Sequence, residues 1–356
     1  MESMVTENIL DFFKNKKVFI TGHTGFKGSW LSLILDFYGA KVKGFSKKPS
    51  TNPNLFDNLS FSKNFNSVIA DVKNYEILKQ EILKFDPDFI FHLAAQPIVI
   101  DSYKDPVETY HTNFNGTLNL LESLRELDKC SVIIITTDKV YENNENKVSF
   151  KEADKLGGKD PYSSSKSASE LLVSSYSSSF FSGTNINIST VRAGNIIGGG
   201  DWSPYRLLPD VIRCCYEGSE LIIRNPNSVR PWQHVLDPIF GYIHLAKKLD
   251  SNPERYVGSW NFGPENNKPI SVQQIIDIIK NKGLNFNIRI KNDKTKKESK
   301  FLQLDISKSK KILKWTPKLC AEDSIEYTLN WYKGFYSNSP AKDLIINDLK
   351  KYLTLK

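Results

Sequence analysis

The sequence predicts an α/β protein, built as a doubly wound parallel sheet with a smaller, partly interleaved α/β lobe. Short apolar strands alternate with amphipathic helices from residue 18 to residue 191, which is typical of a parallel sheet covered on both faces. This alternation loosens after Gly194. The chain has 356 residues, a length that favours about two domains, or one large domain with an added lobe.

The predicted strands are short runs rich in Val, Ile and Phe, and the helices have apolar residues three or four positions apart. Strands are expected at 18–20, 41–45, 66–70, 88–93, 131–135 and 187–191. Helices are expected through residue 37 after the first strand and then at 75–84, 105–127 and 161–181. The last two begin with Asp-Pro, in which aspartate caps the first turn and proline fits the first helical position.

The remaining chain predicts the smaller lobe. Its helices are expected at 207–217, 237–248, 271–280 and 323–336, and a strand at 260–262 is expected to return to the main sheet. We therefore expect residues 1–193 to bind a dinucleotide, with returning segments near 231–265. Residues 194–356 would then form the substrate lobe, with an interleaved boundary.

Composition excludes several classes of protein. The net charge of +8 comes from residues 280–356, which hold 18 basic and 8 acidic residues. The lysine run from Lys291 to Lys300 is either a solvated loop or a groove for an anionic ligand. No aromatic residues alternate with these lysines, so we expect no nucleic-acid partner. The four cysteines lack zinc-site spacing, which predicts reduced thiols, no metal and a cytoplasmic protein. No apolar stretch is long enough to span a membrane.

A glycine-rich turn follows the first strand and opens the first helix. Gly22, Gly25 and Gly28 have the G-x-x-G-x-x-G spacing of a Rossmann-type dinucleotide site, where the helix N-terminus holds the pyrophosphate. The acidic residue that grips the ribose of NAD is absent from the second strand, which ends near Lys47. That lysine either binds the extra phosphate of NADP or lies in a solvated loop. Asp71, after the third strand, is expected to contact the adenine edge or the adjacent amide.

A tyrosine and a lysine lie four residues apart on the helix at 161–181. Tyr162 and Lys166 therefore share a helix face, and the ammonium would lower the pKa of the phenol. A tyrosine of this kind accepts the proton of an alcohol that a nicotinamide oxidises. The alternative is an exposed surface pair, which the preceding glycine turn and the Thr136-Thr137 strand end disfavour.

Longer motifs carry a resemblance to a known family. The glycine turn, residues 92–95 (HLAA) and the Thr137/Tyr162/Lys166 set resemble the extended short-chain dehydrogenases/reductases. Four strings are similar to the CDP-glucose 4,6-dehydratases within that family: GHTGFKGSW at 22–30, TNPNLF at 51–56, RAGNIIGGGDW at 192–202 and RPWQHV at 230–235. The resemblance extends to about Pro317. Thr137 departs from the serine usual in this branch, and Asp237 from a glutamate.

The resemblance implies roles for individual residues. The catalytic set would be Thr137, Asp138, Lys139, Tyr162 and Lys166. NAD would be held by Gly22, His23, Gly25, Phe26, Lys27, Gly28, Asp71, Val72, Leu93, Ala94 and Ala95 together with Tyr162 and Lys166. The CDP-sugar would be bound by Gln96, Asn195, Arg206 and Arg230. Arg192 is either a structural arginine or a ligand contact.

The implied reaction removes hydride from C4 of the sugar, eliminates water across C5–C6 and returns hydride to C6. The cofactor is therefore recycled, which favours NAD over NADP. Asp138 would protonate the departing hydroxyl, and Lys139 would act either as the C5 base or as an electrostatic stabiliser. The resemblance also implies a homodimer or homotetramer with its interface on the helices at 105–127 and 161–181. A nucleotide-sugar 4-epimerase and a non-catalytic nucleotide-sugar-binding protein are the alternatives.

Overall fold

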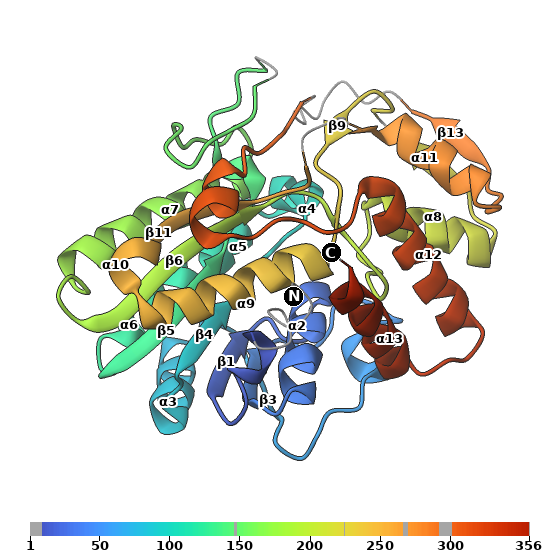
Figure 1. The fold of residues 1–356 in the computed structure, drawn as a ribbon. Helices are drawn as coiled ribbons and strands as arrows, with labels where there is room; N and C mark the ends of the chain where they lie inside the picture. The colour runs from blue at the N-terminus through green and yellow to red at the C-terminus, as the bar shows by residue number, and fades with distance from the viewer. Residues whose placement is uncertain (1–8, 146–147, 224, 266–269, 292–300, 356) are drawn as a thin grey trace.

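A parallel sheet of seven strands runs through the computed structural model of the protein (Figure 1). The structure describes residues 9–145, 148–223, 225–265, 270–291 and 301–355. The strand order is β11-β6-β5-β4-β1-β2-β3. The strands are β1 (Lys17–Thr21), β2 (Lys41–Ser46), β3 (Asn66–Ile69), β4 (Phe89–His92), β5 (Lys129–Ile135), β6 (Asn185–Ala193) and β11 (Gly258–Phe262). The predicted fold class and all seven strands of the main sheet are confirmed.

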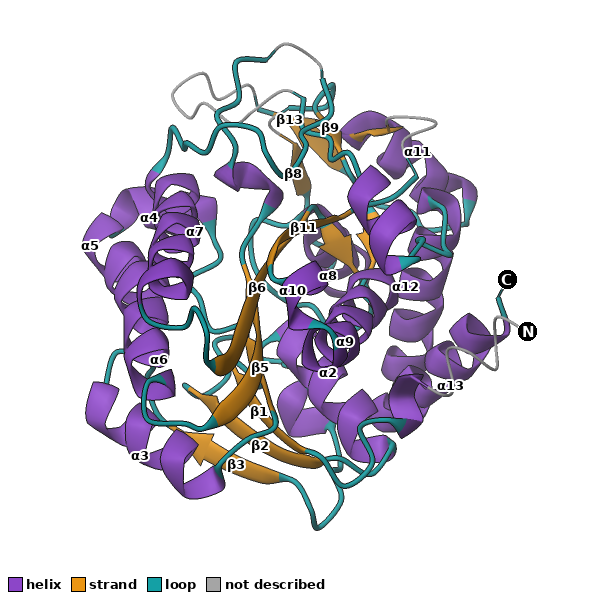
Figure 2. Cartoon of the chain, turned by 60° about the vertical axis from the view of Figure 1, so that its left-hand side comes forward, coloured by secondary structure: helices purple, strands orange, loops and turns teal. Residues whose placement is uncertain are grey.

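Helices cover both faces of this sheet (Figure 2). On one face lie α3 (Tyr75–Phe85), α4 (Val99–Lys104), α5 (Pro106–Tyr110), α6 (Gly116–Leu124) and α7 (Pro161–Ser179). On the other lie α2 (Phe26–Phe37), α9 (Leu236–Ser251), α10 (Pro253–Tyr256), α12 (Ala321–Tyr336) and α13 (Ala341–Thr354). A single turn of π-helix at His111–Asn115 joins α5 to α6, so the predicted helix at 105–127 is present but not uniform.

The strands are apolar on both sides because each face of the sheet is buried. Within β4 and β5, Ile90 and Val132 belong to one apolar core, and Phe91 and Ile133 belong to the other. Successive side chains of a strand point to opposite faces, so a strand buried on both faces reads as a continuous apolar run. The strands of this sheet can therefore be located in the sequence by their continuous apolar composition.

Within the described residues, three two-stranded pairs accompany the main sheet, and the sequence patterns did not predict them as pairs. They join β7 (Ile196–Ile197) to β10 (Gln233–His234), β9 (Val229–Arg230) to β12 (Ile270–Ser271), and β8 (Leu221–Ile223) to β13 (Ile288–Ile290). The helices α8 (Leu207–Glu217) and α11 (Val272–Asn281) lie beside them (Figure 2). The lysine run falls largely on 292–300, outside the described residues, so its predicted roles stay untested.

Both Asp-Pro signals begin helices as predicted. The Asp105 carboxylate accepts the amide of Glu108 at 2.9 Å, and the Asp160 carboxylate accepts the amide of Ser163 at 2.9 Å. The second cap starts α7 immediately before Tyr162 and therefore sets where that tyrosine lies. Within the described ranges, the chain contains no helix that is both long enough and apolar enough to cross a membrane.

Candidate active site

The glycine turn has the shape that a dinucleotide phosphate requires. Gly22 has a φ of +75°, and a Cβ on it would lie 2.6 Å from the amide nitrogen of Ala94. A Cβ on Gly28 would lie 2.1 Å from the carbonyl oxygen of Gly22, so this glycine lets α2 pack against the turn. Gly25 faces open space apart from one contact at 3.4 Å, and no side chain caps the helix there. The amides of the first turn of α2 are thus left available to an anion.

Two residues of this turn project in different directions. Lys27 is half-buried and lines a cavity of about 310 Å³, together with Phe26, Leu93 and Ala95. His23 instead turns inward beneath Gly44, where its Nε2 lies 2.7 Å from the hydroxyl of Ser67. Burial lowers the pKa of His23 to about 4. The His23 ring therefore supports β2 from below, and the part of this residue in holding NAD stays a prediction.

The next predicted cofactor residues lie at the carboxyl end of β3. Asp71 forms long ion pairs with Lys47 at 3.9 Å and Lys73 at 3.6 Å, and its side chain is 29% exposed. Val72 is buried and contacts Gly116, where a Cβ would lie 2.8 Å from the valine methyl group. Both residues lie outside the lining of the cavity. Lys47 also lies 3.8 Å from the carboxylate of Glu108, so two carboxylates offset its charge.

The five predicted catalytic residues converge on the same cavity. Thr137, Asp138 and Lys139 follow β5 in a short 3₁₀ turn, and Tyr162 and Lys166 come from α7. Thr137 donates a hydrogen bond to the Asp138 carboxylate at 3.1 Å. The Lys166 ammonium donates to the carbonyl of Ile135 at 3.0 Å. Tertiary structure thus places the phenol, the ammonium, the hydroxyl and the carboxyl group around one space.

Burial changes the acidity of these groups. It raises the pKa of Tyr162 to about 12, because the effect of burial exceeds that of a hydrogen bond from Thr137. This direction is opposite to the one expected from the lysine alone. Burial also lowers the pKa of Lys166 to about 8 and raises the pKa of Asp138 to about 6. In both lysine and aspartate, burial penalises the charged form.

Lys27 adds another cation to the cavity. Burial and the nearby charges of Arg206 and Lys166 lower the pKa of Lys27 to about 7. Five cationic side chains line the cavity and three carboxyl groups oppose them: Lys27, Lys139, Lys166, Arg206 and Arg230 against Asp138, Asp201 and Asp210. An excess of cationic side chains around a cavity is typical of a site for a diphosphate.

The predicted substrate residues divide into two groups. Asn195, Arg206 and Arg230 line the cavity as expected. Gln96 lies outside the lining of this cavity, and its contact with the sugar nucleotide stays a prediction. Its amide group donates to the hydroxyl of Thr109 at 2.9 Å, and its carbonyl accepts the amide of Ile98. Gln96 therefore shapes the loop that carries Ile98 and Val99 into the cavity.

Sequence reasoning missed Asp201, which lies within the GGGDW string. Its buried carboxylate pairs with Arg206 at 2.9 Å and accepts the amide of Ser203 at 3.0 Å. The carboxylate therefore orients Arg206 toward the cavity. An aspartate five residues before a predicted ligand arginine was the available signal, but only the fold shows that the two side chains meet.

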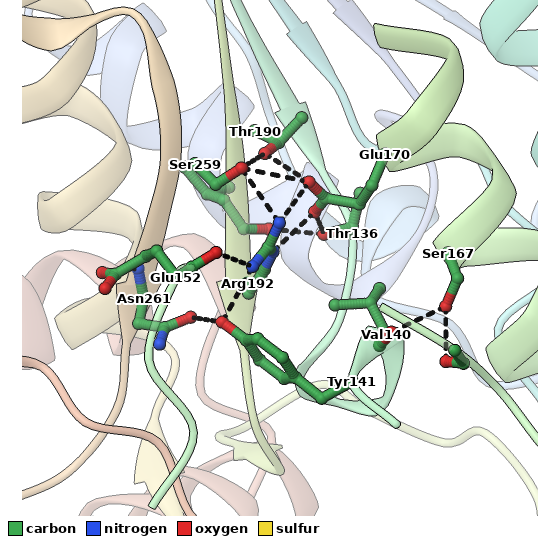
Figure 3. A network of polar contacts seen from close by, with 12 residues as sticks. Thr136, Val140, Tyr141, Glu152, Ser167, Glu170, Thr190, Arg192, Ser259 and Asn261 are labelled. Carbon is green, nitrogen blue, oxygen red and sulfur yellow. Dashed lines mark hydrogen bonds and ion pairs between the residues drawn. The ribbon is translucent and has the colours of Figure 1, made fainter. Parts of the chain in front are cut away.

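Arg192 proves to be structural. Its guanidinium is buried and binds the carboxylate of Glu170, with Nη2 at 2.8 Å and Nε at 3.0 Å (Figure 3). His92 is likewise satisfied, between the hydroxyls of Thr21 at 2.8 Å and Thr117 at 3.2 Å. Over the part of the chain that the structure describes, no cluster of three His, Cys, Asp or Glu side chains is suited to a metal ion.

Comparison with known proteins places the chain in a family. The family profile described as GDP-mannose 4,6 dehydratase matches residues 19–328. The chain belongs to this family. The CDP-glucose 4,6-dehydratase of Salmonella typhimurium is 40% identical over 332 residues, covering 91% of this chain and 92% of that protein. The CDP-paratose 2-epimerase of Salmonella typhi is 27% identical and covers 90% of this chain and 97% of that protein.

Solved structures share the fold. The dTDP-glucose 4,6-dehydratase of Bacillus anthracis, in complex with NAD, superimposes with a TM-score of 0.75 at 23% identity. It covers 90% of this chain and 98% of its own length. The UDP-glucose 4-epimerase of Thermotoga maritima, with UDP-glucose, gives a TM-score of 0.78 at 22% identity, covering 90% of this chain and 99% of that one. Dehydratases and epimerases therefore share this architecture, so only the site chemistry separates them.

Proposed function

We propose that this chain is an NAD-dependent CDP-glucose 4,6-dehydratase, a hydro-lyase that produces CDP-4-dehydro-6-deoxyglucose. The observation that carries the proposal is the convergence of Thr137, Asp138, Lys139, Tyr162 and Lys166 on one cavity beside the open glycine turn. The 40% identity to a CDP-glucose 4,6-dehydratase over 91% of the chain supports the substrate class.

The first step is removal of the 4-hydroxyl proton. The chemistry that bound NAD supplies is reversible hydride transfer, taken from C4 and returned to C6, and its positive ring favours a phenolate nearby. Tyr162 accepts the proton, and Thr137 beside it holds the hydroxyl. Because burial raises the pKa of Tyr162 to about 12, we expect this residue to become a base only in the assembled complex.

The second step is elimination of water from C5 and C6. Asp138 donates a proton to the departing 6-hydroxyl, a role that suits a carboxyl group whose pKa burial has raised to about 6. Lys139 lines the same cavity and faces the developing charge as either base or stabiliser. A 4-epimerase needs no such acid, so this pair favours a dehydratase.

The division of the chain follows from the same proposal. Residues 1–193, with the returning segments near 231–265, hold NAD, and residues 194–356 bind the nucleotide sugar. The offset charge of Lys47 supports NAD over NADP, because two carboxylates compete with any added phosphate for that lysine. The free thiols of Cys130, Cys214, Cys215 and Cys320 support action in the cytoplasm.

Product analysis tests the substrate. Incubation with CDP-, dTDP-, GDP- and UDP-glucose in turn should give a 4-keto-6-deoxy product chiefly from the CDP-sugar. A galactose-configured product would overturn the dehydratase assignment in favour of an epimerase. Equal turnover of all four sugar nucleotides would overturn the proposed specificity for CDP but not the dehydratase activity.

Isotope tracing tests the order of steps. Deuterium placed at C4 of CDP-glucose should appear at C6 of the product, and solvent deuterium should enter C5. Lys139→Met should abolish exchange at C5 if lysine is the base, and slow it only partly if lysine stabilises charge. A C4 label lost to solvent would contradict the proposed cycle.

The same proposal includes a dimer. Helices α5, α6 and α7 lie side by side as predicted, and they leave Val107 and Leu171 each 62% exposed. Exposed aliphatic side chains on adjacent helices favour a self-association surface. Sedimentation at micromolar concentration should show a dimer or tetramer, and Leu171→Asp should shift it toward monomer. A wild-type monomer would contradict this part.

A further inference from the structure

A buried carboxylate lies behind the catalytic cavity, where β5 meets α7. Glu170 accepts hydrogen bonds from the hydroxyls of Thr136 at 2.5 Å and Thr190 at 2.7 Å (Figure 3). The same carboxylate holds both Nε and Nη2 of Arg192, and the two charged side chains are only 2% and 3% exposed. Each oxygen of Glu170 thus has at least two donors.

The guanidinium is equally well satisfied. Beyond Glu170, Arg192 donates to the hydroxyls of Tyr141 and Ser259, each at 2.9 Å, and to the carbonyl of Glu152 at 3.0 Å. Figure 3 shows these contacts drawing together β6, β11 and the segment after β5. A buried ion pair with this many hydrogen bonds can persist without water. The stability of this ion pair, however, does not explain why the pair lies directly behind the catalytic cavity.

The pair contacts the strand that carries the catalytic threonine. Lys166 and Glu170 are successive-turn neighbours on α7. The Lys166 ammonium holds the carbonyl of Ile135, and the Glu170 carboxylate holds the hydroxyl of Thr136, the next residue. Thr137 follows immediately and lies close enough to Tyr162, one turn earlier on the same helix, to affect the pKa of the phenol. Two turns of one helix therefore bind two consecutive residues at the end of β5, and the turn before them lies beside the third.

The charge of Glu170 also reaches the cavity. Burial lowers the pKa of Lys166, and Glu170 is the charged group that opposes this effect. Burial acts to raise the pKa of Glu170 itself, but the hydrogen bonds and charge of Arg192 outweigh it and hold that pKa below its usual value. The carboxylate thus stays ionised behind the ammonium of Lys166.

We infer that Glu170 is a positioning residue whose hydrogen bond to Thr136 fixes the end of β5, and with it Thr137, in register with Tyr162 and Lys166. This inference rests on the proposed dehydratase function. Glu170 does not line the cavity, so it acts through Thr136 and not on substrate. Alignment of reacting groups is worth large factors in rate, so a small displacement of Thr137 should slow turnover.

A matched pair of variants tests the inference. Thr136→Val and Thr190→Val each remove one buried hydroxyl that donates to Glu170, and each leaves the ion pair with Arg192 in place. Only Thr136 adjoins Thr137. We expect Thr136→Val to lower kcat for CDP-glucose on the order of tenfold and Thr190→Val to change it by less than about twofold. KM and the dissociation constant of NAD, followed by fluorescence titration, should stay within about twofold in both.

Melting temperatures, and a variant that restores the hydroxyl group at position 136, complete the test. A purely structural carboxylate predicts similar losses of melting temperature and of kcat in the two Val variants, and that result would overturn the inference. Thr136→Ser keeps the hydroxyl and should recover most of the wild-type kcat. If Thr136→Val does not fold, Thr136→Ala against Thr190→Ala gives the same comparison. If the wild-type enzyme makes no 4-keto product, the proposed function is refuted. If the wild-type enzyme turns over CDP-glucose and the Thr136→Val variant is equally active, only the positioning role is refuted.

Discussion

Two buried groups of charged side chains flank the end of β5, and they differ in how completely their charges are paired. The paired cluster is Glu170 with Arg192, in which each charged group has several hydrogen bonds. The cavity cluster is Lys27, Lys166 and Asp138, whose charges face a shared space of about 310 Å³. Lys166 and Glu170 are one helical turn apart, so position in the fold alone does not separate the two clusters.

Pairing decides the acidity of these groups. In the paired cluster, the partner outweighs burial, so the pKa of Glu170 is lowered and that of Arg192 is raised. In the cavity cluster, burial dominates and moves the pKa of Lys27 to about 7, of Lys166 to about 8 and of Asp138 to about 6. Groups that titrate near neutral pH can exchange protons during turnover, whereas firmly ionised ones hold structure. The difference therefore separates the groups suited to reaction from those suited to support.

Loss of the phenol should have the largest effect on activity. Tyr162→Phe removes the proton acceptor and should lower kcat by about 10³-fold, within the range for general acid–base groups. Affinity for CDP-glucose, measured by calorimetry, should change only a few-fold because one oxygen is lost. Tyr176→Phe is the matched control on the same helix, since its hydroxyl binds Glu122 at 2.6 Å away from the cavity. Wild-type turnover by Tyr162→Phe would mean that another residue is the base.

Breaking the paired cluster should destabilise the fold. Glu170→Gln leaves Arg192 buried without its counter-charge, which costs about 3–5 kcal/mol in comparable buried pairs. Urea unfolding followed by circular dichroism measures this change. The exposed partner of Lys17 provides the control: Asp86→Asn, at 70% exposure, should leave the unfolding midpoint nearly unchanged.

The same variant should alter the response to acid. The folded pKa of Glu170 is lowered, so its contribution to stability is present above the unfolded carboxyl pKa and is lost as pH falls through the folded value. The stability difference between wild type and Glu170→Gln should therefore shrink below about pH 4. A difference that is constant down to pH 2 would contradict this assignment.

Removal of the candidate acid should slow elimination and simplify its pH dependence. The pKa of Asp138 is about 6, so its protonated form declines as pH rises above that value and the rate of elimination should fall with it. Asp138→Asn should lower kcat by about 10²-fold. It should also abolish the fall in rate above about pH 6, which is the descending limb of the pH profile. Reduced cofactor should accumulate in the variant and absorb in the near ultraviolet. A descending limb that survives the substitution would assign it to another group.

The smallest expected effect is a shift in the pH at which the descending limb of the kcat profile occurs. Burial raises the pKa of Asp138, and the charge of Lys139 is the leading influence that opposes the rise. Lys139→Met should therefore raise the pKa of Asp138 further and move the descending limb to higher pH, whatever it does to the height of the profile. The measurement is the pH dependence of kcat for both proteins. An unmoved or lowered limb would show that Lys139 does not act on Asp138 in the complex.

Much of this protein could be predicted from its sequence. The seven main strands are short apolar runs because both faces of the sheet are buried, and two Asp-Pro caps mark where α5 and α7 begin. The glycine spacing and the Tyr162–Lys166 interval are local patterns whose geometry follows from a turn and a helix. Local order of this kind depends on neighbours along the chain, so it could be predicted without knowledge of the fold.

Tertiary structure decided what depends on distant partners. It turned His23 beneath Gly44, committed Gln96 to the loop at Ile98 and brought Asp201 to Arg206. It also reversed the expected acidity of Tyr162, because burial raises the pKa of the phenol more than the hydrogen bond with Thr137 lowers it. Side-chain direction, desolvation and charge pairing are set by segments far apart in the chain, which is why spacing predicted the residues of this site but not the environment that tunes them.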